Sequence, residues 1–325
     1  MKLLRRSTAT KCMTRRAAVV LLACALPLAV FGQGIRATSK SHGATPEDLR
    51  RMKSAHWMNQ WQVAQSVNFT DIDQSPYPTG PYDATIPRNA NCYVVFRDKD
   101  KKTYDMITAT EPPTNEHNYG VFLSHKSPCG VCSNLVDLAV YLEKPDLTNP
   151  VRICGLASLL SKDANRDCLA KVIGFSEPCA AIWFHNTQHT RSRCFSLCIA
   201  RLLTPNNAGY GFSNPCRPMD EDDDEDDDED DAAGMCQNTI NRQPACADFQ
   251  YQTGSKYRLN ACLQCDECQS GPLFQKIAGR TRRASGIQSG IKRPDIPHIN
   301  HNYFTTTNSS SSNSSHNVVL GVDVS

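Results

Sequence analysis

The chain has 325 residues, of which 40% are apolar and 21% charged, and it contains 16 cysteines. This length and apolar content exclude wholesale disorder and allow one or two folded domains. The formal net charge of +2 conceals two opposed regions, because the first 32 residues hold six basic side chains and no acidic one, whereas residues 220–231 are twelve consecutive carboxylates. Removing the first region takes the charge to −4, and leaving out the second takes it to +8. We therefore expect a basic folded body.

Residues 1–32 have the features of a secretory signal. A basic segment ends at Arg16, residues 17–31 are apolar, and Gly32 is a small residue suited to cleavage. A spanning helix needs about 20 apolar residues, and this stretch is shorter and is interrupted by Pro27. We expect a cleaved signal peptide, a secreted protein and a polar linker over 33–44. The long basic segment leaves an uncleaved type II anchor as the alternative.

Fourteen cysteines follow the leader, and in an oxidising compartment we expect them to form up to seven disulfides. They comprise one isolated cysteine, a group of seven and a group of six: Cys92, Cys129, Cys132, Cys154, Cys168, Cys179, Cys194, Cys198, Cys216, Cys236, Cys246, Cys262, Cys265 and Cys268. The pairing cannot be read from a sequence. Because seven is odd, the middle group cannot close on itself, and if the last six pair among themselves, Cys92 bonds to the middle group.

The segment 45–126 is expected to combine a helix with a small sheet. Thr45 is a capping residue followed by a proline and two acids, so we expect a helix from there to about Ala64. Apolar runs at 92–96 and 103–108 flank a polar turn and predict a hairpin, and residues 119–123 predict a third strand. No helix-length crossover separates these runs, which indicates an antiparallel sheet.

Residues 127–205 have apolar side chains at helical spacing and predict a cysteine-rich helical bundle. The first helix is expected to begin at Ser127 and Pro128 and to end at Lys144. Further helices are expected over 164–173, 176–189 and 191–203. Because their cysteines lie among the apolar residues, disulfides should staple these helices together.

Three segments complete the chain. Residues 206–245 form a long connection that contains the acidic run, as expected of a surface insertion. Residues 246–299 are cysteine-rich, with a short helix over 270–279 and a basic stretch after it, and the polar tail 300–325 is expected to be disordered. The predicted fold class is α+β, mainly α: a disulfide-stapled helical bundle with a small antiparallel β-hairpin or sheet at the N-terminal side.

Cys129 and Cys132 are three positions apart at the predicted start of a helix, with two residues between them. That geometry lowers a thiol pKa and supports thiol–disulfide exchange, so a lumenal oxidoreductase using this pair is an alternative function. No strand and helix alternation of the thioredoxin type surrounds the pair, and we favour a structural role. A Cys-x-x-Cys at the start of a helical bundle also resembles saposin-like domains, which implies a compact helical module with lipid contact. The later cysteine spacings depart from that family's pattern.

Two groups have partial metal-binding spacing. His185 and His189 lie four residues apart, as zinc ligands on a helix do, but the glutamate of a metalloprotease is absent. Cys262, Cys265 and Cys268 lack the fourth ligand of the ferredoxin spacing. We expect ordinary histidines and disulfides here, with no metal and no cofactor.

The charged segments give the candidate binding surfaces. The acidic run lacks the pattern of a calcium loop, so we expect it to be a solvated insertion. The alternatives are weak binding of divalent cations and docking of the run on the basic stretch of the same chain. The expected ligands of the basic stretch are anionic glycans or phosphate head groups, with salt weakening the contact; its candidate residues are Lys276, Arg280, Arg282, Arg283, Lys292 and Arg293. Nucleic acid is not expected, because a secreted chain seldom meets it and no aromatic residues are interleaved there.

Short motifs agree with passage through the secretory pathway. Asn68, Asn308 and Asn313 begin glycosylation sequons. Arg280-Thr-Arg-Arg283 has the form of a proprotein-convertase site, with a folded arginine cluster as the favoured interpretation. The sequence contains no G-x-S-x-G motif, no phosphate-binding glycine loop and no recognisable pair of catalytic carboxylates.

Four motifs together resemble a secreted, cysteine-rich family of unicellular algae: residues 129–141, 149–155, 174–183 and 278–286. The resemblance spans about residues 92–304 and implies neither an activity nor a catalytic residue. We therefore expect a non-catalytic extracytoplasmic module that binds an anionic ligand, a cation or a partner protein. Membrane contact would require an uncleaved leader or the helical bundle.

Overall fold

The structure is a computed structural model, and it describes the helices, the strands and five disulfides of the fold. The described residues all lie in one compact unit that spans residues 38–325. They are residues 43–77, 90–114, 119–144, 146–157, 161–200, 204–207, 259–293 and 296–304, without the side chains of residues 162, 200 and 268. The predicted leader, the acidic run, residues 305–325 of the polar tail and the sequons at Asn308 and Asn313 lie outside them. Residues 300–304, the start of the tail that was expected to be disordered, are described, and His301 and Tyr303 among them are buried.

The first helix begins where the sequence predicts but ends early. Helix α3 spans Pro46–Ser54, and a capping box joins Thr45 to Asp48 at its start. The chain then forms strand β1, His56–Trp57, and helix α4, Gln60–Ser66, so the prediction of one helix to about Ala64 is wrong. Strand pairing overrides the helical spacing here, because the His56 and Met58 amides donate to the Lys102 and Tyr104 carbonyls while Trp57 becomes buried.

The sheet contains the three predicted strands and β1. Strands β2 (Asn91–Phe96), β3 (Thr103–Ala109) and β4 (Val121–His125) are antiparallel neighbours, as expected. Strand β1 pairs in parallel with β3, which makes the sheet mixed, with the order β1-β3-β2-β4. The turn between β2 and β3 is held by the Asp98 carboxylate, which accepts from the Thr103 amide at 2.7 Å.

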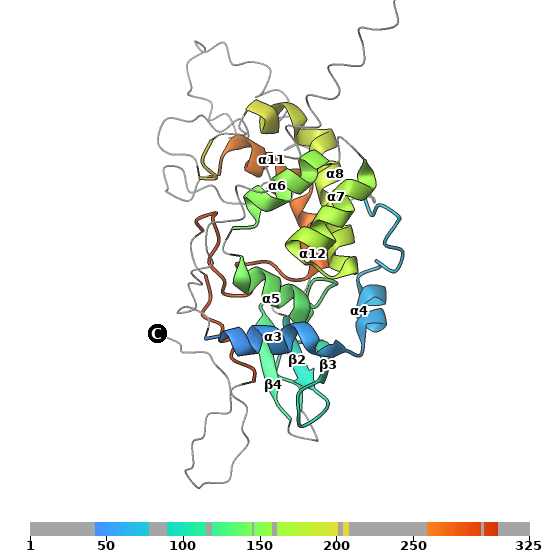
Figure 1. The fold of residues 1–325 in the computed structure, drawn as a ribbon, viewed down its shortest axis with the longest axis vertical. Coiled ribbons are helices and arrows are strands. Elements are labelled where there is room, and N and C mark those ends of the chain that lie inside the picture. Colours follow the sequence, from blue (N-terminus) through green and yellow to red (C-terminus); the bar gives the residue numbers. More distant parts are fainter. Residues whose placement is uncertain are drawn as a thin grey trace, which may run out of the picture. The chain divides into compact units, whose positions relative to one another are not determined.

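Helices hold far more of the described residues than strands do, so the predicted fold class is confirmed. They are α5 (Leu135–Glu143), α6 (Thr148–Ala157), α7 (Lys162–Asp167), the π-helix η1 (Cys168–Ile173), α8 (Glu177–Ala200), α11 (Ala261–Gln269) and α12 (Gly271–Ala278). Figure 1 shows α3 and α5 beside the strands, and α6, α7, α8 and α11 grouped together. Helix α5 packs on α3, and α8 packs on α11 and α12.

Two helix predictions need correction, and two helices, α6 and α11, were not predicted. Helix α5 starts at Leu135 rather than Pro128, because the Asn134 side chain caps it by accepting from the Asp137 amide at 2.8 Å. The two helices expected over 176–189 and 191–203 are one continuous helix, α8. Helix α6 was not predicted, because Pro150 and Gly155 obscure its apolar period.

Five disulfides connect these elements. Cys92–Cys129 joins β2 to the loop before α5, Cys132–Cys179 joins that loop to α8, and Cys154–Cys168 joins α6 to η1. Cys194–Cys265 and Cys198–Cys262 are two bridges between α8 and α11. Cys92 thus bonds to the middle group, as inferred, but the premise that the last six cysteines pair among themselves is wrong. Cys216, Cys236 and Cys246, and the side chain of Cys268, lie outside the described residues.

None of the helices in the described ranges has an apolar stretch of the length that crossing a bilayer requires.

Candidate functional site

Two of the sequence motifs meet backbone to backbone. The Val131 and Cys132 amides donate to the carbonyls of Ile277 and Ala278 at 2.9 and 3.0 Å. The approach is closest at Gly130 and Gly279, where a Cβ on either glycine would lie 2.3 Å from a backbone atom of the other segment. Glycine is required at both positions because no side chain fits. We call this contact between residues 129–134 and 277–286 the motif junction.

Arg280 lies at the centre of the motif junction with 0% of its surface exposed. Its guanidinium donates to the carbonyls of Cys132 and Ser133 at 3.1 and 2.7 Å and to the Ser124 hydroxyl at 2.6 Å. It also donates to the Ser124 carbonyl and to the Ser285 hydroxyl. Burial lowers its pKa, yet an arginine stays charged in proteins. The prediction that Arg280 binds an external anion is therefore wrong, since neutral oxygens surround it and solvent does not reach it.

Two buried histidines extend this polar network. His125 contacts the hydroxyls of Ser127 and Ser133, each at 2.8 Å from a ring nitrogen, and burial lowers its pKa well below 6.5. His301 contacts the Tyr303 hydroxyl and the Ser285 carbonyl, also at 2.8 Å. A serine hydroxyl next to an imidazole has the geometry of a nucleophile and its base, but Ser133 and His125 are both 0% exposed. Their hydrogen bonds hold the junction together.

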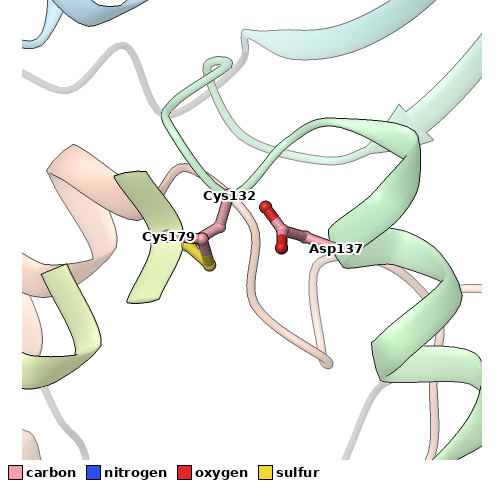
Figure 2. A group of neighbouring side chains, drawn as sticks. All are labelled: Cys132, Asp137 and Cys179. Atoms are coloured by element: carbon pink, nitrogen blue, oxygen red, sulfur yellow. A yellow bond between two sulfur atoms is a disulfide. The ribbon is translucent and has the colours of Figure 1, made fainter. Parts of the chain in front are cut away.

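Cys132, Asp137 and Cys179 lie together with ligand atoms within 4.8 Å of one another (Figure 2). Both sulfurs belong to one disulfide, so neither is the thiolate that a metal requires. The buried Asp137 carboxylate accepts from the Ser176 amide and hydroxyl at 2.7 and 2.6 Å, and from the Asn134 amide group. Asp137 therefore ties the start of α5 to Ser176, directly before α8.

Asp137 gives a testable pH dependence. Burial raises its pKa from 3.8 to about 6, and the hydrogen bonds from Ser176 and Asn134 offset the increase only in part. The folded state therefore binds this proton more tightly than the unfolded state, and the stabilisation present below pH 3.8 is lost as the pH rises through 6. We expect the stability of the natural protein relative to Asp137→Asn to fall by about 1.4 kcal/mol per pH unit between about pH 4 and pH 6. Urea unfolding at several pH values measures this, and a constant difference would contradict it.

The Cys129 and Cys132 sulfurs are bonded to different partners, Cys92 and Cys179, and both residues are at least 98% buried. They are not a dithiol pair, and they precede the cap of α5 instead of opening the helix. The sequence suggested a redox site because this spacing is shared by exchange motifs and by turns. The structure accounts for the spacing as a turn whose two cysteines anchor different elements.

The zinc candidates also have other partners. His185 contacts the Ile72 carbonyl at 3.0 Å, whereas His189 contacts the Ser270 hydroxyl at 3.0 Å and stacks on Tyr77. Burial lowers the pKa of both histidines. Cys262 and Cys265 are the α11 ends of two disulfides. Each of these four side chains therefore has a partner within the protein.

The six cations of the basic stretch separate into two classes. Arg282 donates to the carbonyls of Tyr141 and Lys144 at the end of α5, and Arg293 forms an ion pair with Glu267, so these two join Arg280 in holding the fold. The side chains of Lys276, Arg283 and Lys292 are exposed.

Two of the exposed cations, Lys276 and Arg283, line a cleft of about 870 Å³ together with Lys126. Its walls include Thr281 and Pro297, and no acidic side chain lines it among the described residues. Within the same part of the chain, the three cations form no ion pair. We call this feature the basic cleft. Sequence analysis missed Lys126, because it lies 150 residues before Lys276 and only the fold brings the two to one surface.

A second cavity of about 480 Å³ lies among α6, α8, α11 and α12. Its apolar walls include Val151, Trp183, Leu263 and Phe274. It shares four residues with the basic cleft: Gln275, Thr281, Arg283 and Ile296. We call it the apolar cavity.

The polar groups of the apolar cavity include a guanidinium with an unsatisfied nitrogen. Arg152 lines the cavity, its Nη2 atom is buried without a hydrogen bond, and burial lowers its pKa. Asp266 accepts from the side chains of Thr190 and Asn186, and burial raises its pKa to about 6. Arg152 belongs to the 149–155 motif, but that motif alone indicates no cavity, because the other walls come from distant helices.

Comparison with known proteins matches residues 162–222 and 203–300 to the model of a family of unknown function (DUF8771). No curated protein and no solved structure matches the chain. The matched region contains α7, η1, α8, α11 and α12, and the 277–286 side of the motif junction. The protein is thus a disulfide-rich module of the type found in extracellular and secretory proteins, similar over its helical half to a family without an assigned activity.

Proposed function

We propose that this protein is a non-catalytic, extracytoplasmic module whose basic cleft binds an oxyanion ligand of the sulfate or phosphate type. The single observation that carries the proposal is the convergence of Lys126, Lys276 and Arg283 on one cleft, without an acidic neighbour among the described residues. Three cations without carboxylate partners favour a multiply charged anion, because each can donate charge-assisted hydrogen bonds to it. The polar groups that resemble catalytic residues are buried in the motif junction, which supports a binding role over catalysis.

Two kinds of molecule carry such an oxyanion, a sulfated glycan and a lipid with a phosphorylated head group. Direct binding measurements distinguish between them. Binding of the secreted protein to a sulfated heparin oligosaccharide is measured by calorimetry, and binding to vesicles that contain a phosphatidylinositol phosphate is measured by co-sedimentation. We expect saturable binding to one of them and a weakening of about tenfold for each cation removed in Lys276→Gln and Arg283→Gln, as expected for hydrogen bonds to charged groups. Added salt should weaken binding.

Lys292→Gln is the matched control, because Lys292 is an exposed cation of the same stretch that does not line the basic cleft. It removes one charge and should leave the affinity almost unchanged. Equal losses in all three variants would show a diffuse charge effect and would overturn the cleft as the site, as would the absence of binding to both probes.

We further propose secretion after cleavage near Gly32, with glycosylation at Asn68. Asn68 is exposed and has a φ of 52°, and it follows closely after α4. The five disulfides support an oxidising compartment. The N-terminal sequence and the intact mass of the protein from its natural source, before and after deglycosylation, test both points; a mature chain that begins at Met1 without glycan would refute them.

A further inference from the structure

We infer that the apolar cavity is a second binding site, one that takes an amphipathic monocarboxylate with its carboxylate at Arg152 and its hydrocarbon chain between α6, α8 and α12. This site is distinct from the oxyanion site that we propose in the basic cleft. Its volume of about 480 Å³ is in the range of pockets that enclose small organic ligands. Such pockets are mainly apolar and contain a few convergent polar groups that fix the orientation of the ligand.

The walls and the entrance suit a hydrocarbon chain. Trp183 and Phe274 pack edge to face with ring centroids 4.6 Å apart and form one wall. Leu156, Phe195 and Ile199 line the same cavity, yet 48%, 53% and 48% of their surfaces are exposed. Large apolar side chains that are half exposed around a cavity leave apolar surface in contact with water. A bound hydrocarbon chain would cover this surface, which is the main source of favourable free energy.

The charges of the cavity favour an anion over a cation. Five arginines and two acids line it. One acid, Glu267, forms an ion pair with Arg293, and the other, Asp266, accepts from Thr190. Arg282 is occupied by carbonyls at the end of α5.

Arg152 is the cation that an incoming carboxylate would pair with, once its guanidinium turns so that the buried Nη2 atom faces the cavity. Burial lowers its pKa, and the carboxylates of Asp146 and Asp266 raise that pKa in part without forming an ion pair with the guanidinium. Within the described residues Arg152 forms no ion pair, and its buried Nη2 atom has no acceptor. A guanidinium nitrogen without an acceptor inside an apolar wall is costly, and a carboxylate matches the planar geometry of the guanidinium. A neutral ligand of the same length would gain the apolar contacts alone, whereas a cationic one would be repelled. The ligand class is therefore an alkyl carboxylate.

Two variants test separately how the protein binds the carboxylate and the hydrocarbon chain of the ligand. Arg152→Gln removes the charge and keeps a polar side chain. Gly155→Leu fills the cavity, because Gly155 lines it and a Cβ there would have no atom within 4 Å. Gly155 lies within helix α6, where leucine is the better helix former, so this variant should fold. Lys276→Gln is the control for the basic cleft, since Lys276 does not line the apolar cavity.

The probes are dodecanoate, dodecanol and dodecyltrimethylammonium, measured by calorimetry against the full secreted chain, with thermal unfolding as the test that each variant is folded. We expect the natural protein to bind one dodecanoate, and to bind dodecanol about tenfold or more weakly, as the loss of a charged hydrogen bond predicts. Arg152→Gln should remove that preference while dodecanol binding stays the same, Gly155→Leu should abolish binding of both, and Lys276→Gln should change neither.

Absence of dodecanoate binding would overturn the inference, as would equal affinities for dodecanoate and the cationic probe or undiminished binding by Gly155→Leu. None of these outcomes depends on whether the basic cleft binds an oxyanion.

Discussion

Replacement of Gly279 by alanine is expected to destabilise the protein by about 3 kcal/mol or more, because overpacking of about 1–3 kcal/mol adds to the conformational strain. Gly279 ends α12 with a φ of 72°, a conformation that residues with a side chain rarely adopt. Its Cβ would lie 2.3 Å from the Gly130 nitrogen and 2.8 Å from the Pro128 carbonyl oxygen. These are backbone atoms, so the two segments of the motif junction must separate. Urea unfolding measures the loss.

The matched control is Gly155→Ala. Gly155 is a helical glycine, and a Cβ at its position would have no atom within 4 Å, so the same chemical change should stabilise the protein by about 0.5–1 kcal/mol. The two substitutions should thus have opposite signs. A Gly279→Ala variant as stable as the natural protein would show that the two segments of the junction do not approach this closely.

Arg280→Met is expected to destabilise the protein by about 3 kcal/mol or more, because several buried polar groups lose their donor in a place that solvent does not reach. Methionine fills much of the volume but donates no hydrogen bond, so three buried carbonyls and two hydroxyls lose a donor. Each buried polar group left without a partner costs about 1–3 kcal/mol. Guanidinium chloride unfolding, followed by circular dichroism, gives the free energy.

Arg283→Met provides the comparison, because Arg283 lies three residues away in the same motif and is exposed. Its effect on stability should be within about 0.5 kcal/mol. Equal losses of stability at the two positions would mean that the motif contributes to stability through its net charge. The buried guanidinium of Arg280 would then not organise the motif junction.

The elements with strong local signals were predictable. The hairpin of β2 and β3 has two apolar runs around a polar turn, and α12 is bracketed by Ser270 and Gly279, so neighbouring residues determine both. Helix α3 carries its start signal in Thr45 and Pro46. Its end was not predictable, because β1 forms through pairing with β3, which begins 47 residues further along the chain, as the register of His56 with Thr103 shows.

The candidate site depended on contacts that a sequence does not reveal. Arg280 and Arg283 have the same chemistry and lie in one basic stretch, yet one is fully buried and the other lines both cavities. What separates them is the approach of Gly130 to Gly279, a contact between segments 149 residues apart. For the same reason the cysteine spacing indicated disulfides without indicating that Cys129 and Cys132 hold different elements.

Peptide mapping of the unreduced protein by mass spectrometry tests most directly whether the motif cysteines are structural links between the sheet, the loop before α5 and helix α8. The fold predicts cross-linked peptides for Cys92–Cys129 and Cys132–Cys179, together with the bridges from α6 to η1 and from α8 to α11, and no alkylation of these ten cysteines before reduction. A bridge between Cys129 and Cys132, or their alkylation as free thiols, would contradict this fold and would return the redox function as the better explanation of the motif.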